Sequence, residues 1–116
     1  MNCYIKGGFN MTLEMKSFFN SENNQWKLEV KGEIDVFTAK NLREKIKDIY
    51  NKKQKDIILD FKQLNYIDST GLGVIIGAYG RMKEKNNNLI IINAKQNVLK
   101  LLTITGLDKI LIKTNF

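Results

Sequence analysis

The chain has 116 residues and a formal net charge of +7, from nineteen Lys and Arg side chains against twelve Asp and Glu. Hydrophobic residues make up 43% and charged residues 27%, which is typical of a globular protein, and the length favours one domain. There is no histidine, no proline and a single cysteine. These absences exclude Ser-His-Asp and Cys-His catalysis, an internal disulfide and the usual structural zinc sites.

Targeting signals are weak in this sequence. The longest nearly apolar stretch, residues 72–80, is too short to span a bilayer. The first ten residues hold no continuous apolar run, so we expect no secretory signal. The sequence therefore predicts a cytoplasmic protein with no membrane contact, no metal and no cofactor.

The positive charge lies in residues 35–116, because residues 1–34 carry equal numbers of cations and anions. Arg43 and Arg81 are the only arginines, and the lysines fall mainly on helix-like stretches. Readers of nucleic acid favour arginine and exposed aromatic side chains. We therefore interpret the lysines as a solvated surface and expect no direct nucleic-acid binding. The alternative is attraction to an acidic partner or to nucleic acid.

Apolar alternation and short apolar runs predict the strands, and we expect residues 1–10 to be a tail that precedes a domain at 11–116. A polar turn at 21–24 separates the first two strands. The five predicted strands are residues 12–20, 26–32, 56–61, 89–93 and 110–112.

Apolar residues at helical spacing predict three helices, over residues 38–50, 69–85 and 96–105. Asp35 and Thr38 are candidate caps for the first helix, and Gly106 is the expected residue after the third. Strands that alternate with helices predict an α/β fold with a mixed, mostly parallel β-sheet and helices packed on it. The opening pair of strands can be antiparallel.

The segment Tyr66–Gly73, YIDSTGLG, places a hydroxyl at the start of the second helix. Asp68 or Ser69 can cap that helix, and its dipole favours a phosphate carried on Ser69. The segment does not fit the aspartic-protease signature, the P-loop or the nucleophile elbow. The remaining alternative is that Ser69 only caps the helix and the glycines only allow close packing.

Three segments resemble one family. The sequence YIDSTGLGVIIG resembles the phosphorylation-site segment of STAS-domain anti-sigma factor antagonists. Residues 32–39, GEIDVFTA, are similar to that family's connection from its second strand to its first helix, and residues 101–107, LLTITGL, resemble the end of its last conserved helix. The three motifs occur in the family's order and cover about residues 11–116.

This resemblance implies the STAS fold and a protein that is not an enzyme. Unphosphorylated members bind an anti-sigma factor that is also a serine kinase, and the sigma factor is released. The kinase uses ATP to phosphorylate the serine after the aspartate, here Ser69, and a phosphoserine phosphatase reverses this. The partner would supply the machinery of phosphoryl transfer, and we expect the chain alone to be a monomer.

The expected docking surface combines the 35–38 loop with the face of the second helix that continues from Ser69. We assign Leu72, Ile75, Ile76, Tyr79 and Met82 to the core, and Ala78 and Arg81 to the exposed face. In the alternative, Gly73, Gly77 and Gly80 pack against the sheet. The predicted partner-binding residues are Asp35, Thr38, Asp68, Thr70, Gly71, Gly73, Val74 and Gly77.

Two other functions compete with this interpretation. A phospho-aspartate receiver domain with Asp60 as acceptor lacks the acidic pair that would hold magnesium after its first strand. A STAS interaction module of a transporter or a signalling complex would share the fold without controlling a sigma factor.

Overall fold

A single mixed β-sheet organises the protein, and the computed structural model describes residues 3–7 and 11–112. The strands are β1 (Cys3–Gly7), β2 (Met11–Asn20), β3 (Gln25–Ile34), β4 (Asp56–Ile67) and β5 (Leu89–Ile92). They are hydrogen-bonded in the order of the chain. The pairs β1–β2 and β2–β3 are antiparallel, whereas β3–β4 and β4–β5 are parallel. The predicted mixed sheet is thus confirmed, as is the antiparallel opening pair, but the sheet is not mostly parallel, because two of its four strand pairs are antiparallel.

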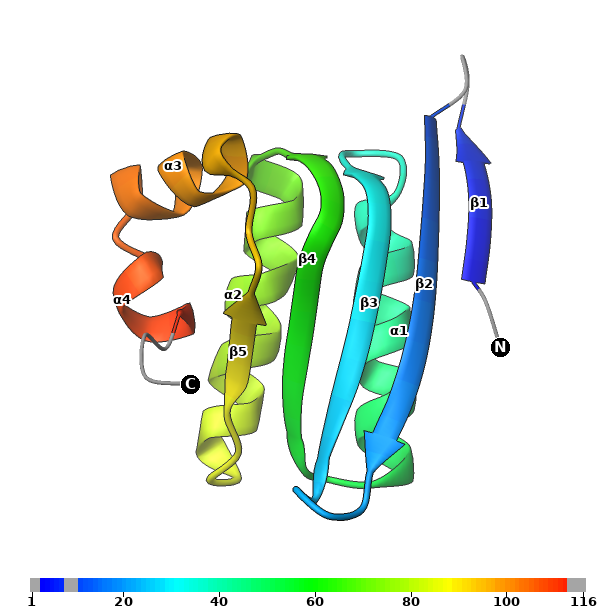
Figure 1. Cartoon of the computed structure of the whole chain (residues 1–116), viewed down its shortest axis with the longest axis vertical. Coiled ribbons are helices and arrows are strands. Elements are labelled where there is room, and N and C mark those ends of the chain that lie inside the picture. Colours follow the sequence, from blue (N-terminus) through cyan, green and yellow to red (C-terminus); the bar gives the residue numbers. More distant parts are fainter. Residues whose placement is uncertain (1–2, 8–10, 113–116) are drawn as a thin grey trace.

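Helices α1 (Ala39–Lys52) and α2 (Ser69–Glu84) lie side by side against one face of the sheet (Figure 1). The shorter α3 (Gln96–Ile104) and α4 (Asp108–Leu111) lie beside β5 at the edge of the sheet. The predicted α/β architecture, with helices packed on the sheet, is therefore present. Among the helices of the described residues, none has the length and the apolar content that a membrane crossing requires.

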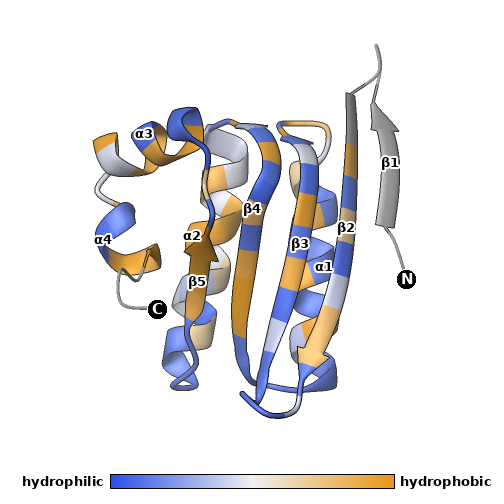
Figure 2. Ribbon diagram, viewed as in Figure 1, coloured by the Kyte–Doolittle hydropathy of each residue, from blue (hydrophilic) through white to orange (hydrophobic). Residues whose placement is uncertain are grey.

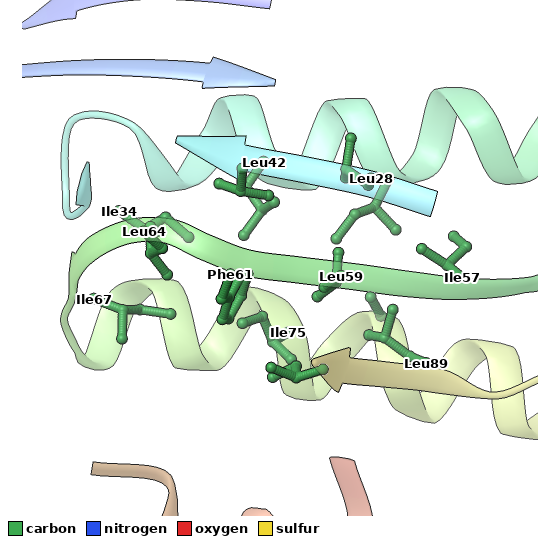
Figure 3. Close-up of a cluster of buried hydrophobic side chains, with 14 of the residues drawn as sticks. Leu28, Ile34, Leu42, Ile57, Leu59, Phe61, Leu64, Ile67, Ile75 and Leu89 are labelled. Carbon is green, nitrogen blue, oxygen red and sulfur yellow. The ribbon is translucent and has the colours of Figure 1, made fainter. Parts of the chain in front are cut away.

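The core lies between the sheet and the two long helices, because alternate strand residues point toward α1 and α2. Trp26, Leu28 and Val30 of β3 are buried, while Lys27 and Glu29 between them are not. This alternation is visible as changing colour along β3 (Figure 2). Leu42 of α1 and Ile75 of α2 reach the same cluster (Figure 3).

Residues 3–7, which we predicted to be part of a tail, instead form the edge strand β1. Their pairing with β2 runs from Cys3 opposite Met15 to Gly7 opposite Met11. The sequence pattern missed it because a five-residue edge strand is specified by its neighbour rather than by its own alternation. The rest of the predicted tail lies outside the described residues.

Strand β4 continues to Ile67, six residues beyond the predicted end at Phe61. After Phe61 the buried residues are Leu64 and Ile67, a spacing of three rather than two. The register between β3 and β4 shifts in this part, as β-bulges cause. The prediction failed because a strand that bulges loses the alternation by which strands are recognised.

The predicted strand at 110–112 is wrong, because Asp108–Leu111 form the short helix α4. Gly106 follows α3 with a positive φ of 77°, as predicted, and the chain reverses there. Leu111 is then fully buried, while Ile110 is exposed. Three consecutive apolar residues fit a strand or a helical turn equally well, so periodicity could not decide between them.

Gly71 is the position at which α2 comes closest to the sheet. A Cβ atom there would lie 2.5 Å from Cγ2 of Ile34 and 2.8 Å from Cγ1 of Ile67, at the ends of β3 and β4. Gly80, nine residues or about two and a half turns later in α2, would place a Cβ atom in open space. Only the first of these glycines is therefore required by packing within the chain.

We expect Gly71→Ala to lower the free energy of unfolding by about 1–3 kcal/mol, because a methyl group would overpack this contact. Gly80→Ala should raise the same free energy by about 0.5–1 kcal/mol, since alanine is the better helix former and meets nothing. Urea denaturation of both variants measures the two effects. Equal changes in the two variants would contradict this assignment.

Candidate functional site

The sequence motif at Ser69 and the loop before α1 lie at the same end of the sheet. Parallel strands end at a common edge, and β3 and β4 are parallel neighbours (Figure 1). The backbone N–H of Asp68 donates a hydrogen bond to the carbonyl oxygen of Ile34 at 3.1 Å. This bond ties the start of α2 to the start of the 35–38 loop, two segments that are far apart in the sequence.

Ser69 is the first residue of α2, and its side chain is exposed. Asp68 caps the helix, as we predicted it could, because its Oδ1 accepts the N–H of Gly71 at 3.0 Å. Within the described part of the chain, the N–H groups of Ser69 and Thr70 and the Ser69 hydroxyl have no hydrogen-bond partner. These free donors and the helix dipole favour negative charge at this position.

Asp35 and Thr38 hold the 35–38 loop from within. Oδ1 of Asp35 accepts the N–H groups of Phe37 and Thr38, at 2.9 and 3.1 Å. Oγ1 of Thr38 accepts the N–H of Asp35 at 3.0 Å and donates to the carbonyl oxygen of Glu33 at 2.9 Å. Thr38 precedes α1, but its side chain makes no capping hydrogen bond to that helix.

Three of the predicted partner-binding residues are buried in the structure. Asp35 is 5% exposed, Thr38 is 0% exposed, and Gly71 is buried under the first turn of α2. Their surfaces are covered by the protein itself, so they position the site and offer almost nothing to a partner. Asp68 and Val74 are half-buried, Gly77 is partly covered, and Thr70 and Gly73 are exposed as predicted.

The loop instead presents two large apolar side chains that the sequence analysis did not single out. Val36 is 64% exposed and Phe37 is 66% exposed. They stand outward because Asp35 and Thr38, on either side of them, bond inward. The sequence did hold a sign of this exposed pair: Val36 and Phe37 stand between two candidate capping residues, inside the segment 32–39 that resembles the family.

The exposed face of α2 differs from the prediction at two positions. Ile76, which we assigned to the core, is 45% exposed, and Ala78, assigned to the surface, is buried. Ser69, Gly73, Ile76 and Gly80 are spaced by four, three and four residues and thus share one helix face. Ala78 turns instead toward α1, where it lines a groove between the two helices.

The glycines of this face are not packed against the sheet. A Cβ atom at Gly73 or Gly80 would meet nothing within 4 Å, and one at Gly77 would meet only the guanidinium of Arg81 at 3.3 Å. The alternative that these glycines serve helix–sheet packing is therefore wrong. We define the docking face as the exposed residues at this end of the molecule: Val36, Phe37, Ser69, Thr70, Gly73 and Ile76.

Asp60 has a structural role on β4. Its Oδ1 accepts hydrogen bonds from the N–H of Lys62 and the amide of Asn93, at 3.0 and 3.1 Å, and its Oδ2 lies 3.4 Å from Nζ of Lys27. In residues 3–7 and 11–112 no three acidic, His or Cys side chains gather where a metal ion could be held. The bonds of Asp60 thus agree with the predicted backbone acceptor rather than with a phospho-acceptor.

Comparison with known proteins identifies the family. The model of the STAS domain family matches residues 21–116. The chain therefore belongs to the STAS-domain family, and its mixed sheet with packed helices is the STAS fold.

Two of the relatives that it matches are anti-sigma-B factor antagonists. The anti-sigma-B factor antagonist of Listeria monocytogenes is 30% identical over 103 residues, which cover 88% of this chain and 87% of the relative. That of Bacillus subtilis is 35% identical over 88 residues, which cover 76% and 80%.

Solved structures of the anti-sigma factor antagonist SpoIIAA have the same fold. Its unphosphorylated form superposes with a TM-score of 0.72 at 21% identity, covering 87% of this chain and 89% of SpoIIAA. The phosphorylated form, from Bacillus, superposes with a TM-score of 0.66 at 21% identity, covering 87% and 92%.

The role of Thr38 as a positioning residue can be tested. We expect Thr38→Val to lower the free energy of unfolding by about 1–3 kcal/mol, because it leaves the N–H of Asp35 and the carbonyl of Glu33 without their buried partner. Thr38→Ser keeps the hydroxyl and is the matched control, with a smaller loss. Urea denaturation measures both, and equal losses would mean that the methyl group rather than the hydroxyl matters.

Proposed function

We propose that this protein is an anti-sigma factor antagonist that works by binding rather than by catalysis. In its unphosphorylated form it binds an anti-sigma factor with serine kinase activity, and the sigma factor is freed. Phosphorylation of Ser69 ends this binding, and a phosphoserine phosphatase restores it. The antagonist relatives and the STAS fold support the class, and the surroundings of Ser69 support the mechanism.

The observation that carries the proposal is the exposed hydroxyl of Ser69, which has no hydrogen-bond partner among residues 3–7 and 11–112 and is set in an apolar and low-relief surface. Val36 and Phe37 are among the most exposed large hydrophobic residues of the described chain. Exposed apolar groups that are clustered in this way are typical of protein interfaces. Gly73 beside Ser69 lets a partner's backbone approach closely, as a kinase needs in order to reach the hydroxyl.

In the phosphorylation step, Oγ of Ser69 forms a bond to the γ-phosphorus of ATP, the bond to the β-phosphate oxygen breaks, and ADP leaves. The hydroxyl proton passes to a base of the kinase. Phosphatase cleavage adds water across the new bond and releases inorganic phosphate. The chain contributes the acceptor hydroxyl and its position, and the partners contribute the catalytic groups.

Phosphorylation would block docking without unfolding the site. A phosphate on Ser69 adds about −1.5 to −2 of charge next to the free N–H groups and the positive end of the α2 dipole, which stabilise it. The same dianion is strongly hydrated, and docking would have to remove that water from the middle of an apolar surface. Binding is thus lost through desolvation, while the helix stays formed.

We expect the kinase and ATP to place one phosphate on Ser69 and to leave Ser69→Ala unmodified, as mass spectrometry can measure. Binding of the phosphorylated chain to the kinase should weaken at least about tenfold, since one misplaced charge in an interface costs several kcal/mol. Ser69→Ala should still bind. Phosphate at another residue, or a large loss of helix in circular dichroism on phosphorylation, would contradict the mechanism.

A bulky residue on the docking face should prevent binding while the fold persists. Gly73→Arg places a long side chain beside Ser69 without clashing within the chain, because the space there is open. Gly80→Arg makes the same change in charge on the same helix face, about two turns further from Ser69. Calorimetry with the anti-sigma factor should find no binding of the Gly73→Arg variant and near-normal binding of the Gly80→Arg variant. Unchanged binding of both would refute the docking assignment.

A further inference from the structure

A groove of about 600 Å³ lies between α1 and α2, and its lining comes from these two helices and from Lys85, the residue that follows α2. Its floor is apolar, since Ile46 of α1 and Ala78 and Met82 of α2 are buried and line it. Arg81, which lines the groove, also reaches back along α2, because its guanidinium lies 3.3 Å from the position that a Cβ atom of Gly77 would take.

The rim of this groove is basic. Arg43 and Lys47 of α1 stand on one side, and Arg81 of α2 and Lys85, the residue that follows α2, stand on the other; all four are exposed. The two helices thus bring together the only two arginines of the chain. Among the described residues, none of these four cations forms an ion pair.

Two acidic residues, Glu44 and Glu84, also lie at the groove, and they leave it with a net positive charge. The remaining titratable group is Tyr50, which is buried and donates a hydrogen bond to Oδ1 of Asn87 at 2.5 Å. Burial, and to a smaller extent the negative charge of Asp56, raises the pKa of its phenol, so the floor stays neutral. The charge of the groove is therefore set by its rim.

We propose that this groove binds an acidic segment of the anti-sigma factor. The acidic side chains of that segment would contact the four cations of the rim, and its apolar side chains would contact the floor. The inference deepens the proposed function, on which it rests, by assigning a second contact area to the same partner. The proposal also explains part of the chain's positive charge. Basic side chains that form no ion pair accelerate the encounter with an acidic partner and favour that partner over others.

The groove fits an acidic protein segment better than nucleic acid. Glu44 and Glu84 would lie against the phosphates of a nucleic acid and repel them, whereas a folded acidic segment can present lysine or neutral residues there. Tyr50 is the groove's only aromatic side chain, and its burial leaves no ring on which a base could stack. An apolar floor also matches an amphipathic segment rather than a phosphate backbone.

The test reverses charge on α1 alone, so that the docking face on α2 and the loop stays unchanged. Arg43→Glu with Lys47→Glu is compared with Lys100→Glu plus Lys109→Glu, two exposed lysines on α3 and α4. Both double variants fall from +7 to a net charge of +3. Calorimetry measures the Kd for the purified anti-sigma factor at about 0.05 and 0.3 M salt. These concentrations lie below and above the roughly 0.1 M at which the Debye length is about 10 Å.

We expect the groove variant to bind at least about tenfold more weakly at low salt and to lose most of its salt dependence, whereas the control changes less than about threefold. Equal weakening of both variants would overturn the proposal, because the charge would then act at long range rather than in the groove. Unchanged binding of the groove variant would overturn it as well.

A second measurement does not depend on the anti-sigma factor. In an amide NMR titration, a glutamate- and leucine-rich peptide of the length of α1 should shift the signals of residues lining the groove and should be released by salt. Shifts spread over the whole surface, or stronger groove shifts with a short DNA duplex than with the peptide, would overturn the proposal. If the chain binds no anti-sigma factor, the proposed function fails while this titration still tests the groove.

Discussion

The close contact of the first turn of α2 with the ends of β3 and β4 is the constraint on which the site depends. Ile34 and Ile67 leave no room for a side chain at position 71, and glycine at this position lets the helix pack closely against both strands. The hydrogen bond from Asp68 to Ile34 fixes the same junction through the backbone. With the helix start held from below, Ser69 can only point outward.

The residues around this junction divide into two groups with different roles. Asp35, Thr38 and Asp68 bond to backbone groups and hold the loop and the helix start in place. Val36, Phe37 and Ser69 are presented to solvent by that framework. Some of the residues that define the motif most clearly in the sequence thus have a structural role. The surface that they support consists of two apolar side chains and one hydroxyl.

Exposed glycines within a helix lower stability, and α2 keeps two of them where nothing in the fold needs them. Gly73 and Gly80 each give up helix propensity of about 1 kcal/mol relative to alanine. Gly73 lies on the docking face beside Ser69, and a local rule that is broken without a gain in packing is typical of functional positions. Ile76, apolar and half exposed on the same face, fits the same explanation. Gly80 lies outside the docking face, and no contact within the fold explains it.

Much of this molecule could be predicted from the sequence, because period-two and helical spacing are local properties. They gave β2, β3, α1, α2 and α3 nearly within their bounds, together with the turn at 21–24 and the cap at Gly106. The sequence alone also determined that the hydroxyl of Ser69 stands at the start of α2, next to a residue that can cap the helix. Tertiary structure decided the rest: the pairing of β1, the bulged end of β4, the helical form of residues 108–111, and which of Ile76 and Ala78 is buried. These outcomes depend on neighbours that are distant in the chain, since burial at a helix edge and pairing at a sheet edge are set by what packs against them, and no local pattern records that.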